Sequence, residues 1–146
     1  MALFVVRRDS VVGVGEAWRR LTAWERHADV VPLTRIAVAA RAGGGVGTVF
    51  VARTGVGVLA FDDPMEVVVW RPPVGGRAGV CRLVKRGAFV TGWAEIEVRS
   101  GVGGGSRVVW REELRVWGVS RVFDSLVGWV ARWVFGRVVR RLLVRP

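Results

Sequence analysis

The sequence has no tyrosine, asparagine or glutamine, and it contains one cysteine, Cys81, and one histidine, His27. A single cysteine excludes an intrachain disulfide. One cysteine and one histidine also exclude a metal site built from several Cys or His ligands. We therefore expect no metal site. Hydrogen bonds and charges in any pocket must come mainly from Arg, Asp and Glu side chains.

The sequence also lacks the glycine-rich motif of a dinucleotide site. Gly13 and Gly15 follow a strand and precede a helix, but Trp18 occupies the third glycine position and no βαβ unit follows. The one lysine, Lys85, lies within a predicted strand and not in a phosphate-binding loop. We therefore expect no cofactor.

No uncharged apolar run approaches the about 20 residues of a membrane-spanning helix, because four arginines interrupt the apolar carboxy-terminal segment. At the amino terminus, Arg7 and Arg8 follow only a few apolar residues, which is the wrong order for a signal peptide. These features predict a cytoplasmic protein.

The chain has 146 residues, of which 51% are hydrophobic. A chain of this length is expected to form one domain, here residues 1–146, with a substantial core. The net charge of +11 is densest in residues 118–146. This charge fits a solvated surface or a contact with an anionic membrane or partner. A nucleic-acid site would need stacking aromatics on a basic face, whereas the tryptophans lie mostly on apolar stripes, so we expect no nucleic-acid partner.

The hydrophobic pattern changes along the chain in a definite order. Residues 2–12 alternate like a strand, and two short helical segments follow at 16–22 and from Trp24 to about Val30, before Pro32. Period-two segments separated by glycine clusters, including Gly43 to Gly45, and by an Asp62-Asp63-Pro64 loop then predict an antiparallel meander. Its strands are expected from Leu33 and over 48–54, 65–70, 80–86, 89–99 and 107–117.

A long amphipathic helix is predicted from about Val119 to Leu143. Its apolar stripe contains Val119, Val122, Phe123, Leu126, Val130, Val134 and Val138. A stripe of this length must be covered, and the curved sheet is the only available partner in the chain. The sequence thus predicts an α+β fold in which a seven-stranded antiparallel sheet wraps around the last helix.

This order of elements resembles the helix-grip superfamily, also called the START-like or Bet v 1-like fold (SRPBCC), and within it the polyketide cyclase/dehydrase and lipid-transport group. The resemblance covers nearly the whole chain and implies a ligand cavity between the sheet, the long helix and the two short helices. Members include cyclases, lipid and quinone carriers and binding proteins, so the fold alone does not fix the function. The patterns that carry the resemblance are Ala17-Trp18 to Thr22-Ala23-Trp24, Arg53 to Gly57, Phe61-Asp62-Asp63-Pro64-Met65, Trp70-Arg71-Pro72-Pro73, Gly87 to Gly92, and Trp110 to Glu113.

Two charged residues fall among apolar neighbours. Arg53 shares a strand face with Val49 and Val51, and Glu112 shares one with Trp110. If both faces point inward, the two form a polar spot that orients a carbonyl, phenol or carboxylate of a ligand. The alternative is an ordinary salt bridge or two exposed side chains.

Three residues are candidates for acid–base catalysis: His27, Asp63 and Glu112. His27 is the one group with an unperturbed pKa near neutrality, but capping or packing against Trp24 is the simpler explanation. Asp63 precedes Pro64, where turn chemistry is the simpler explanation.

We predict that the chain binds a hydrophobic or aromatic small molecule, such as a lipid, quinone or polyketide, as a carrier or binding protein. The alternative is a polyketide cyclase or dehydratase, and the sequence does not decide whether the protein is an enzyme. Arginines of the last helix, with Trp129 and Trp133, also fit peripheral membrane contact. The oligomeric state is not predicted. The expected ligand-lining residues are Arg53, Trp110, Glu112, Leu126, Val130 and Trp133, and the arginines are Arg137, Arg140, Arg141 and Arg145.

Overall fold

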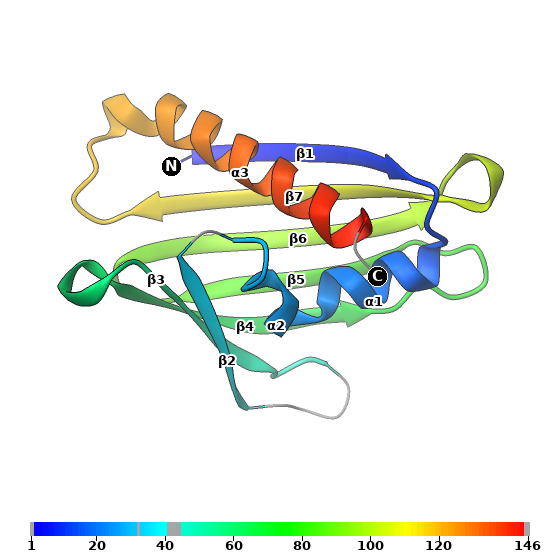
Figure 1. Cartoon of the computed structure of the whole chain (residues 1–146), viewed down its shortest axis with the longest axis horizontal. Coiled ribbons are helices and arrows are strands. Elements are labelled where there is room, and N and C mark those ends of the chain that lie inside the picture. Colours follow the sequence, from blue (N-terminus) through cyan, green and yellow to red (C-terminus); the bar gives the residue numbers. More distant parts are fainter. Residues whose placement is uncertain (1, 32, 41–44, 145–146) are drawn as a thin grey trace.

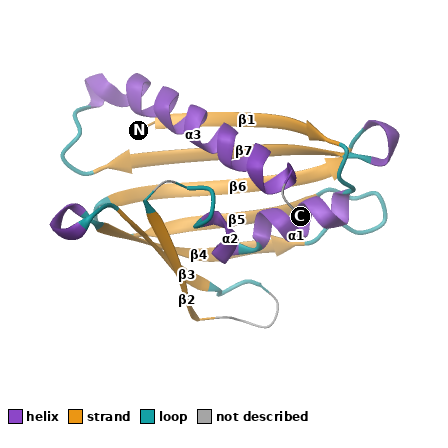
Figure 2. Ribbon diagram, viewed as in Figure 1, coloured by secondary structure: helices purple, strands orange, loops and turns teal. Residues whose placement is uncertain are grey.

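The computed structural model describes residues 2–31, 33–40 and 45–144. A seven-stranded, entirely antiparallel sheet has the order β1-β7-β6-β5-β4-β3-β2 and curves around the helices on one face (Figure 1). Three helices, α1 (Val14–Thr22), α2 (Trp24–His27) and α3 (Asp124–Val144), lie on that face (Figure 2). The strands are β1 (Ala2–Ser10), β2 (Thr34–Ala40), β3 (Val49–Thr54), β4 (Phe61–Arg71), β5 (Gly79–Arg86), β6 (Val90–Ser100) and β7 (Ser106–Val116). The predicted helix-grip architecture is confirmed.

Side-chain alternation builds the inner face of the sheet. On β5, Cys81, Leu83 and Lys85 are buried, whereas Arg82 and Arg86 are more exposed. Burial also alternates along β7, where the face that contains Trp110 is buried, as the sequence predicts. These inward faces form the wall against which the helices pack.

Strand β4 differs from its prediction. Asp62, Asp63 and Pro64 were expected in a loop, but they lie within β4, because the chain turns earlier, at Gly55 and the short 3₁₀ helix Gly57–Leu59. A proline is tolerated here since pairing of β4 with β5 starts only at the following residue, Met65.

The two short helices close one end of the cup. The predicted inward face of α1 is confirmed, since Ala17, Trp18 and Leu21 are all buried. Helix α2 ends at His27, and Pro32, which was expected to end it, lies outside the described residues, as do Gly43 and Gly44. The Arg20 guanidinium donates a hydrogen bond to the Leu143 carbonyl at 2.5 Å and so ties α1 to the end of α3.

Helix α3 lies diagonally across β1 and β7 (Figure 1), and its two halves differ. In the second half, Val138, Val139, Leu142 and Leu143 are buried in the core. In the first half, the helix lies along β1 and approaches it closely at Gly128, where an added Cβ would be 3.9 Å from the Leu3 carbonyl. Helix α3 begins at Asp124 and not at about Val119 as expected, so Val119, Val122 and Phe123 precede it. These three residues of the predicted inner stripe are exposed, as are Leu126 and Val130. Val134 and Val138, at the end of the predicted stripe, pack on the core as expected.

Candidate functional site

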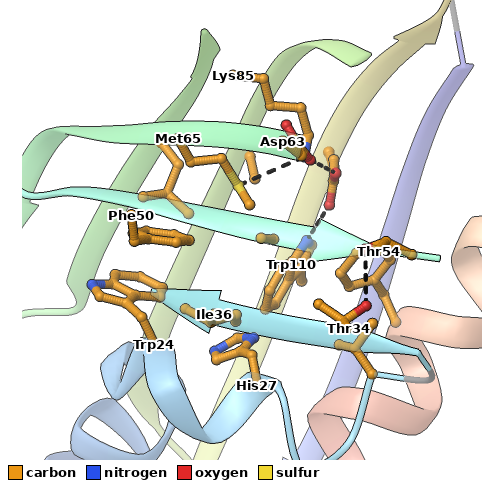
Figure 3. Close-up of a pocket in the computed structure, with 16 residues that line it drawn as sticks. Trp24, His27, Thr34, Ile36, Phe50, Thr54, Asp63, Met65, Lys85 and Trp110 are labelled. Carbon is orange, nitrogen blue, oxygen red and sulfur yellow. Dashed lines mark hydrogen bonds and ion pairs between the residues drawn. The ribbon is translucent and has the colours of Figure 1, made fainter. Parts of the chain in front are cut away.

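A cavity of about 100 Å³ lies between the inner face of the sheet, α2 and α3 (Figure 3). Four aromatic side chains and one group of charged side chains dominate its lining. The remaining lining is mostly aliphatic, with two threonines and His27. The lining residues are Trp24, His27, Val31, Thr34, Ile36, Phe50, Ala52, Thr54, Asp63, Met65, Leu83, Lys85, Ala94, Trp110, Glu112 and Phe135.

The charged group is a lysine between two carboxylates. The Lys85 ammonium nitrogen lies 2.7 Å from Oδ2 of Asp63 and 3.4 Å from Oε1 of Glu112. The indole N–H of Trp110 donates to the other Glu112 oxygen, Oε2, at 3.0 Å. Lys85 and Asp63 are each 8% exposed and Glu112 is 1% exposed, so the whole cluster is buried. We call these three charged residues the polar triad.

Small residues on β6 allow the polar triad to form. Lys85 lies on β5 and Glu112 on β7, so the two are separated by β6. Opposite them on β6 are Gly92, which pairs with Lys85, and Ala94, which pairs with Glu112. Gly92 has φ of +132°, and a Cβ there would lie 1.9 Å from the Glu113 carbonyl oxygen. Only glycine fits this position. Neither Gly92 nor Ala94 carries a long side chain on the strand between Lys85 and Glu112.

Burial and charge act in opposite directions on the triad. Burial raises the pKa of Glu112 and outweighs the Lys85 ammonium and the Trp110 hydrogen bond, which lower it. Burial by itself would lower the pKa of Lys85, but the Glu112 and Asp63 carboxylates together raise it. The lysine is therefore held in its charged form, and Glu112 takes up a proton at a higher pH than an exposed glutamate does.

One oxygen of the triad has no partner. Oδ1 of Asp63 is buried and accepts no hydrogen bond within the part of the chain that the structure describes. A buried acceptor without a donor costs free energy, about 1–3 kcal/mol in typical proteins. Such an atom beside a cavity marks a place where a donor from a ligand or a water is favoured.

The opposite wall of the cavity is aromatic. The rings of Trp24 and Phe50 stack with centroids 4.8 Å apart, and those of Trp110 and Phe135 lie 5.2 Å apart. His27 lies between these two pairs, and the centroid of its ring is 5.7 Å from that of Trp24 and 5.9 Å from that of Trp110. Its Nε2 is 2.9 Å from the Leu21 carbonyl oxygen, which can only accept, so Nε2 carries the hydrogen. Burial lowers the pKa of His27 and favours the neutral ring.

Four of the residues singled out from the sequence line this one cavity: Trp110, Glu112, His27 and Asp63. They come from α2, β4 and β7, elements that are far apart in the sequence. The structure thus brings the three acid–base candidates to one place, whereas their chemical role stays a proposal.

The expected Arg53–Glu112 pair is wrong. The Arg53 side chain is 58% exposed and pairs with Asp62 at 3.2 Å on the outer face of the sheet. Strand β3 is apolar on both faces, and the face that points inward is that of Phe50 and Ala52. The inward partner of Glu112 is Lys85.

Three residues of α3 were expected to line the cavity, and they do not. Leu126, Val130 and Trp133 are exposed, because the face of α3 that meets the sheet is rotated away from them. From α3 the cavity receives Phe135.

Lys85 was missed, as were Trp24, Phe50 and Met65. A signal for Lys85 was present, since it is the only lysine among 23 basic residues and continues the inward alternation of Cys81 and Leu83. Its place in a predicted strand excluded a phosphate-binding lysine but did not by itself indicate a role in the cavity.

Within residues 2–31, 33–40 and 45–144, no three His, Cys, Asp or Glu side chains are grouped so that they could hold a metal ion. Over the same residues, no helix combines the length and apolar character needed to cross a membrane.

Comparison with known proteins identifies the fold. No family model matches the sequence, and no curated protein matches it either. Three solved structures superpose over nearly the whole chain. The protein TTHA0849 from Thermus thermophilus has a TM-score of 0.70, 13% identity, and coverage of 97% of this chain and 93% of that one. Ara h 8.0201 has a TM-score of 0.65, 12% identity and coverage of 98% of both chains.

The third structure is the Zhui aromatase/cyclase from Streptomyces sp. R1128. It has a TM-score of 0.61, 14% identity, and coverage of 96% of this chain and 85% of that one. Structural similarity at sequence identities this low establishes the fold but not the activity. With its seven-stranded sheet closed around α3, the chain has the START-like, or Bet v 1-like, helix-grip fold.

Proposed function

We propose that this protein binds a hydrophobic or aromatic small molecule in the cavity, as a carrier or binding protein. The observation that carries the proposal is an aromatic-walled cavity with one buried polar end. Apolar walls supply binding free energy through the area removed from water, at about 25 cal/mol per Å². A few fixed polar groups then orient the ligand. The aromatase/cyclase with the same fold supports a small-molecule site at the centre of the cup.

The test is native mass spectrometry of the protein purified without detergent, followed by organic extraction and identification of co-purified molecules. A stoichiometric lipid, quinone or polyketide supports the proposal. The matched variants are Ala52→Trp, which fills the cavity, and Ala37→Trp, which adds the same side chain to an exposed position of the neighbouring strand. Ligand lost in Ala52→Trp alone is the expected result. Equal retention in both variants would place the ligand elsewhere and refute the proposal.

A second candidate is a cyclase or dehydratase that acts on a bound polyketide-like chain. It is favoured by Glu112, whose pKa is raised by burial, because a carboxyl group that keeps its proton nearer to neutral pH can act as a general acid. His27, held neutral, offers a basic ring nitrogen. Turnover of a model polyketide that survives His27→Phe, Asp63→Asn and Glu112→Gln would argue against acid–base catalysis.

We also propose peripheral membrane contact through the first half of α3. Leu126, Trp129 and Trp133 are exposed there, with Trp129 at 67% and Trp133 at 61%, and Phe123 is exposed in the 3₁₀ turn Arg121–Phe123 just before α3. The surrounding charge is positive, and the exposed arginines Arg121, Arg132, Arg137 and Arg140 are matched on α3 by a single acidic residue, Asp124. Arg145, which was counted with this group, lies outside the described residues. A basic helix with an exposed tryptophan face matches an anionic lipid surface.

Vesicle co-sedimentation tests this contact. We expect binding to vesicles of phosphatidylcholine with phosphatidylglycerol, weaker binding at high salt, and loss of binding in a Trp129→Ser/Trp133→Ser variant. Val102→Ser, at an exposed position in the β6–β7 connection, is the control. Equal binding to neutral vesicles, or a concentration-dependent dimer that the tryptophan variant abolishes, would contradict the proposal.

A further inference from the structure

The polar triad has an excess of acceptor oxygens over donor hydrogens. An ammonium group carries three hydrogens. Around the Lys85 nitrogen, three acceptors lie in reach: Oδ2 of Asp63 at 2.7 Å, Oε1 of Glu112 at 3.4 Å and the Met65 sulfur at 3.7 Å. These three contacts direct the lysine ammonium toward Oδ2 of Asp63, Glu112 and Met65, and not toward Oδ1 of Asp63.

Other hydrogen bonds of the lining are directed away from Asp63. The Trp110 indole hydrogen goes to Glu112, and the His27 Nε2 hydrogen goes to the Leu21 carbonyl. The hydroxyl groups of Thr34 and Thr54 share a hydrogen bond of 2.9 Å. Oδ1 of Asp63 is a buried acceptor that has no hydrogen-bond donor among the described residues. A ligand group that meets this oxygen must supply the hydrogen.

The charge of the site excludes an anion at the same place. The triad contains one cation and two carboxyl groups, so its formal charge is −1, or zero when Glu112 is protonated. A ligand carboxylate would bring a further negative charge against Asp63 in a buried setting, which is unfavourable. A neutral hydroxyl group has no such penalty.

The size and walls of the cavity limit the group that reaches this oxygen. A cavity of about 150 Å³ with apolar walls accommodates benzene, and this one measures about 100 Å³. One ring is therefore the largest group expected beside the polar triad. Stacked or edge contacts with Trp24, Phe50, Trp110 and Phe135 favour an aromatic ring over an aliphatic one.

We propose that the cavity selects a ligand whose buried end is a single hydroxylated aromatic ring, and that its phenolic hydroxyl donates a hydrogen bond to Oδ1 of Asp63. This inference rests on the proposed small-molecule function and narrows it to phenolic ligands. It assigns Asp63 as the residue that determines specificity and Lys85 as the positioning residue that fixes the Asp63 carboxylate.

Three single-ring probes that share a tolyl group test the proposal: p-cresol, toluene and 4-methylbenzoate. Binding is followed by NMR titration of the indole N–H signals of Trp24 and Trp110, which line the cavity. We expect p-cresol to bind at least about tenfold more tightly than either of the other probes, because a hydrogen bond to a charged acceptor distinguishes it. Asp63→Asn should remove this preference for p-cresol over toluene.

The adjacent residue supplies the control. Asp62→Asn changes the same chemistry on the outer face of the sheet, where Asp62 pairs with Arg53, and should alter no affinity. Toluene and p-cresol binding equally would overturn the phenol inference and leave the proposed function standing, as would tighter binding of 4-methylbenzoate. If none of the three probes shifts either indole signal, both the inference and the small-molecule function are refuted. The comparison of probes on the unaltered protein decides the question even if Asp63→Asn does not fold.

Discussion

Asp62 and Asp63 are consecutive residues of β4, but their carboxylates lie on opposite faces of the sheet. Asp62 is half-exposed and lies 3.2 Å from Arg53, whereas Asp63 is buried and lies 2.7 Å from Lys85. Both are ion pairs between a carboxylate and a basic side chain. The two pairs should therefore differ in their contribution to stability, since water screens the outer pair and the protein interior does not screen the inner one.

Removal of the lysine charge should destabilise the fold strongly. In Lys85→Met, the Asp63 and Glu112 carboxylates remain buried without their cation, and breaking a buried pair in this way costs about 3–5 kcal/mol. Arg86→Met is the control on the next residue, because Arg86 pairs with Glu66 on the exposed face and should cost less than about 1 kcal/mol. Urea unfolding of both variants at neutral pH measures the difference. Similar losses in the two would show that the triad does not hold its charges as the structure indicates.

Glu112 should make stability depend on pH in a defined direction. Its folded-state pKa is raised above 4.5, so the folded protein favours the protonated form more than the unfolded chain does. The contribution of Glu112 to stability is therefore fully present below pH 4.5 and is lost as the pH rises through the folded-state pKa. As the pH rises through the folded-state pKa, the unfolding free energy of the unaltered protein should therefore fall relative to that of Glu112→Gln. Urea unfolding at several pH values from about 4 to 8 tests it, and a constant difference between the two proteins would contradict the raised pKa.

The order of the strands and the inward face of most of them could be predicted from the sequence. A strand with one polar and one apolar face has only one orientation that buries the apolar face. The inward position of Trp110 and Glu112 follows from this rule. Strand β3 carries apolar residues on both faces, from Val49 to Ala52, and period-two reasoning could not choose between them. Arg53 was consequently placed on the wrong side.

The same limit applies to α3. Apolar side chains occur around most of its circumference in the first half, so the helical period does not identify the face that meets the sheet. The ring of Phe135 packs on that of Phe4 in β1, with centroids 5.5 Å apart, and this contact is a property of the packed structure. The triad was missed for a related reason: Lys85 and Glu112 meet across the intervening strand β6, opposite Gly92 and Ala94.

Cys81 should be chemically inert in the folded protein. Its side chain is fully buried, and burial raises the pKa of the thiol to about 12. The reactive thiolate is therefore both scarce and inaccessible at neutral pH. A chromogenic disulfide reagent should release its dye slowly from native protein and rapidly, with one equivalent per chain, in urea. Fast reaction without denaturant would mean that β5 opens to solvent.

His27 should destabilise the protein when it becomes protonated. It is the only histidine in the chain, and burial lowers its folded-state pKa below 6.5. The stability that this residue contributes is fully present above pH 6.5 and is lost as the pH falls through the folded-state pKa. The difference in unfolding free energy between the unaltered protein and His27→Phe should therefore shrink between about pH 7.5 and pH 5. Titration of the imidazole Cε1–H signal gives the folded-state pKa directly. A value at or above 6.5 would contradict the expectation that burial holds the ring in its neutral form.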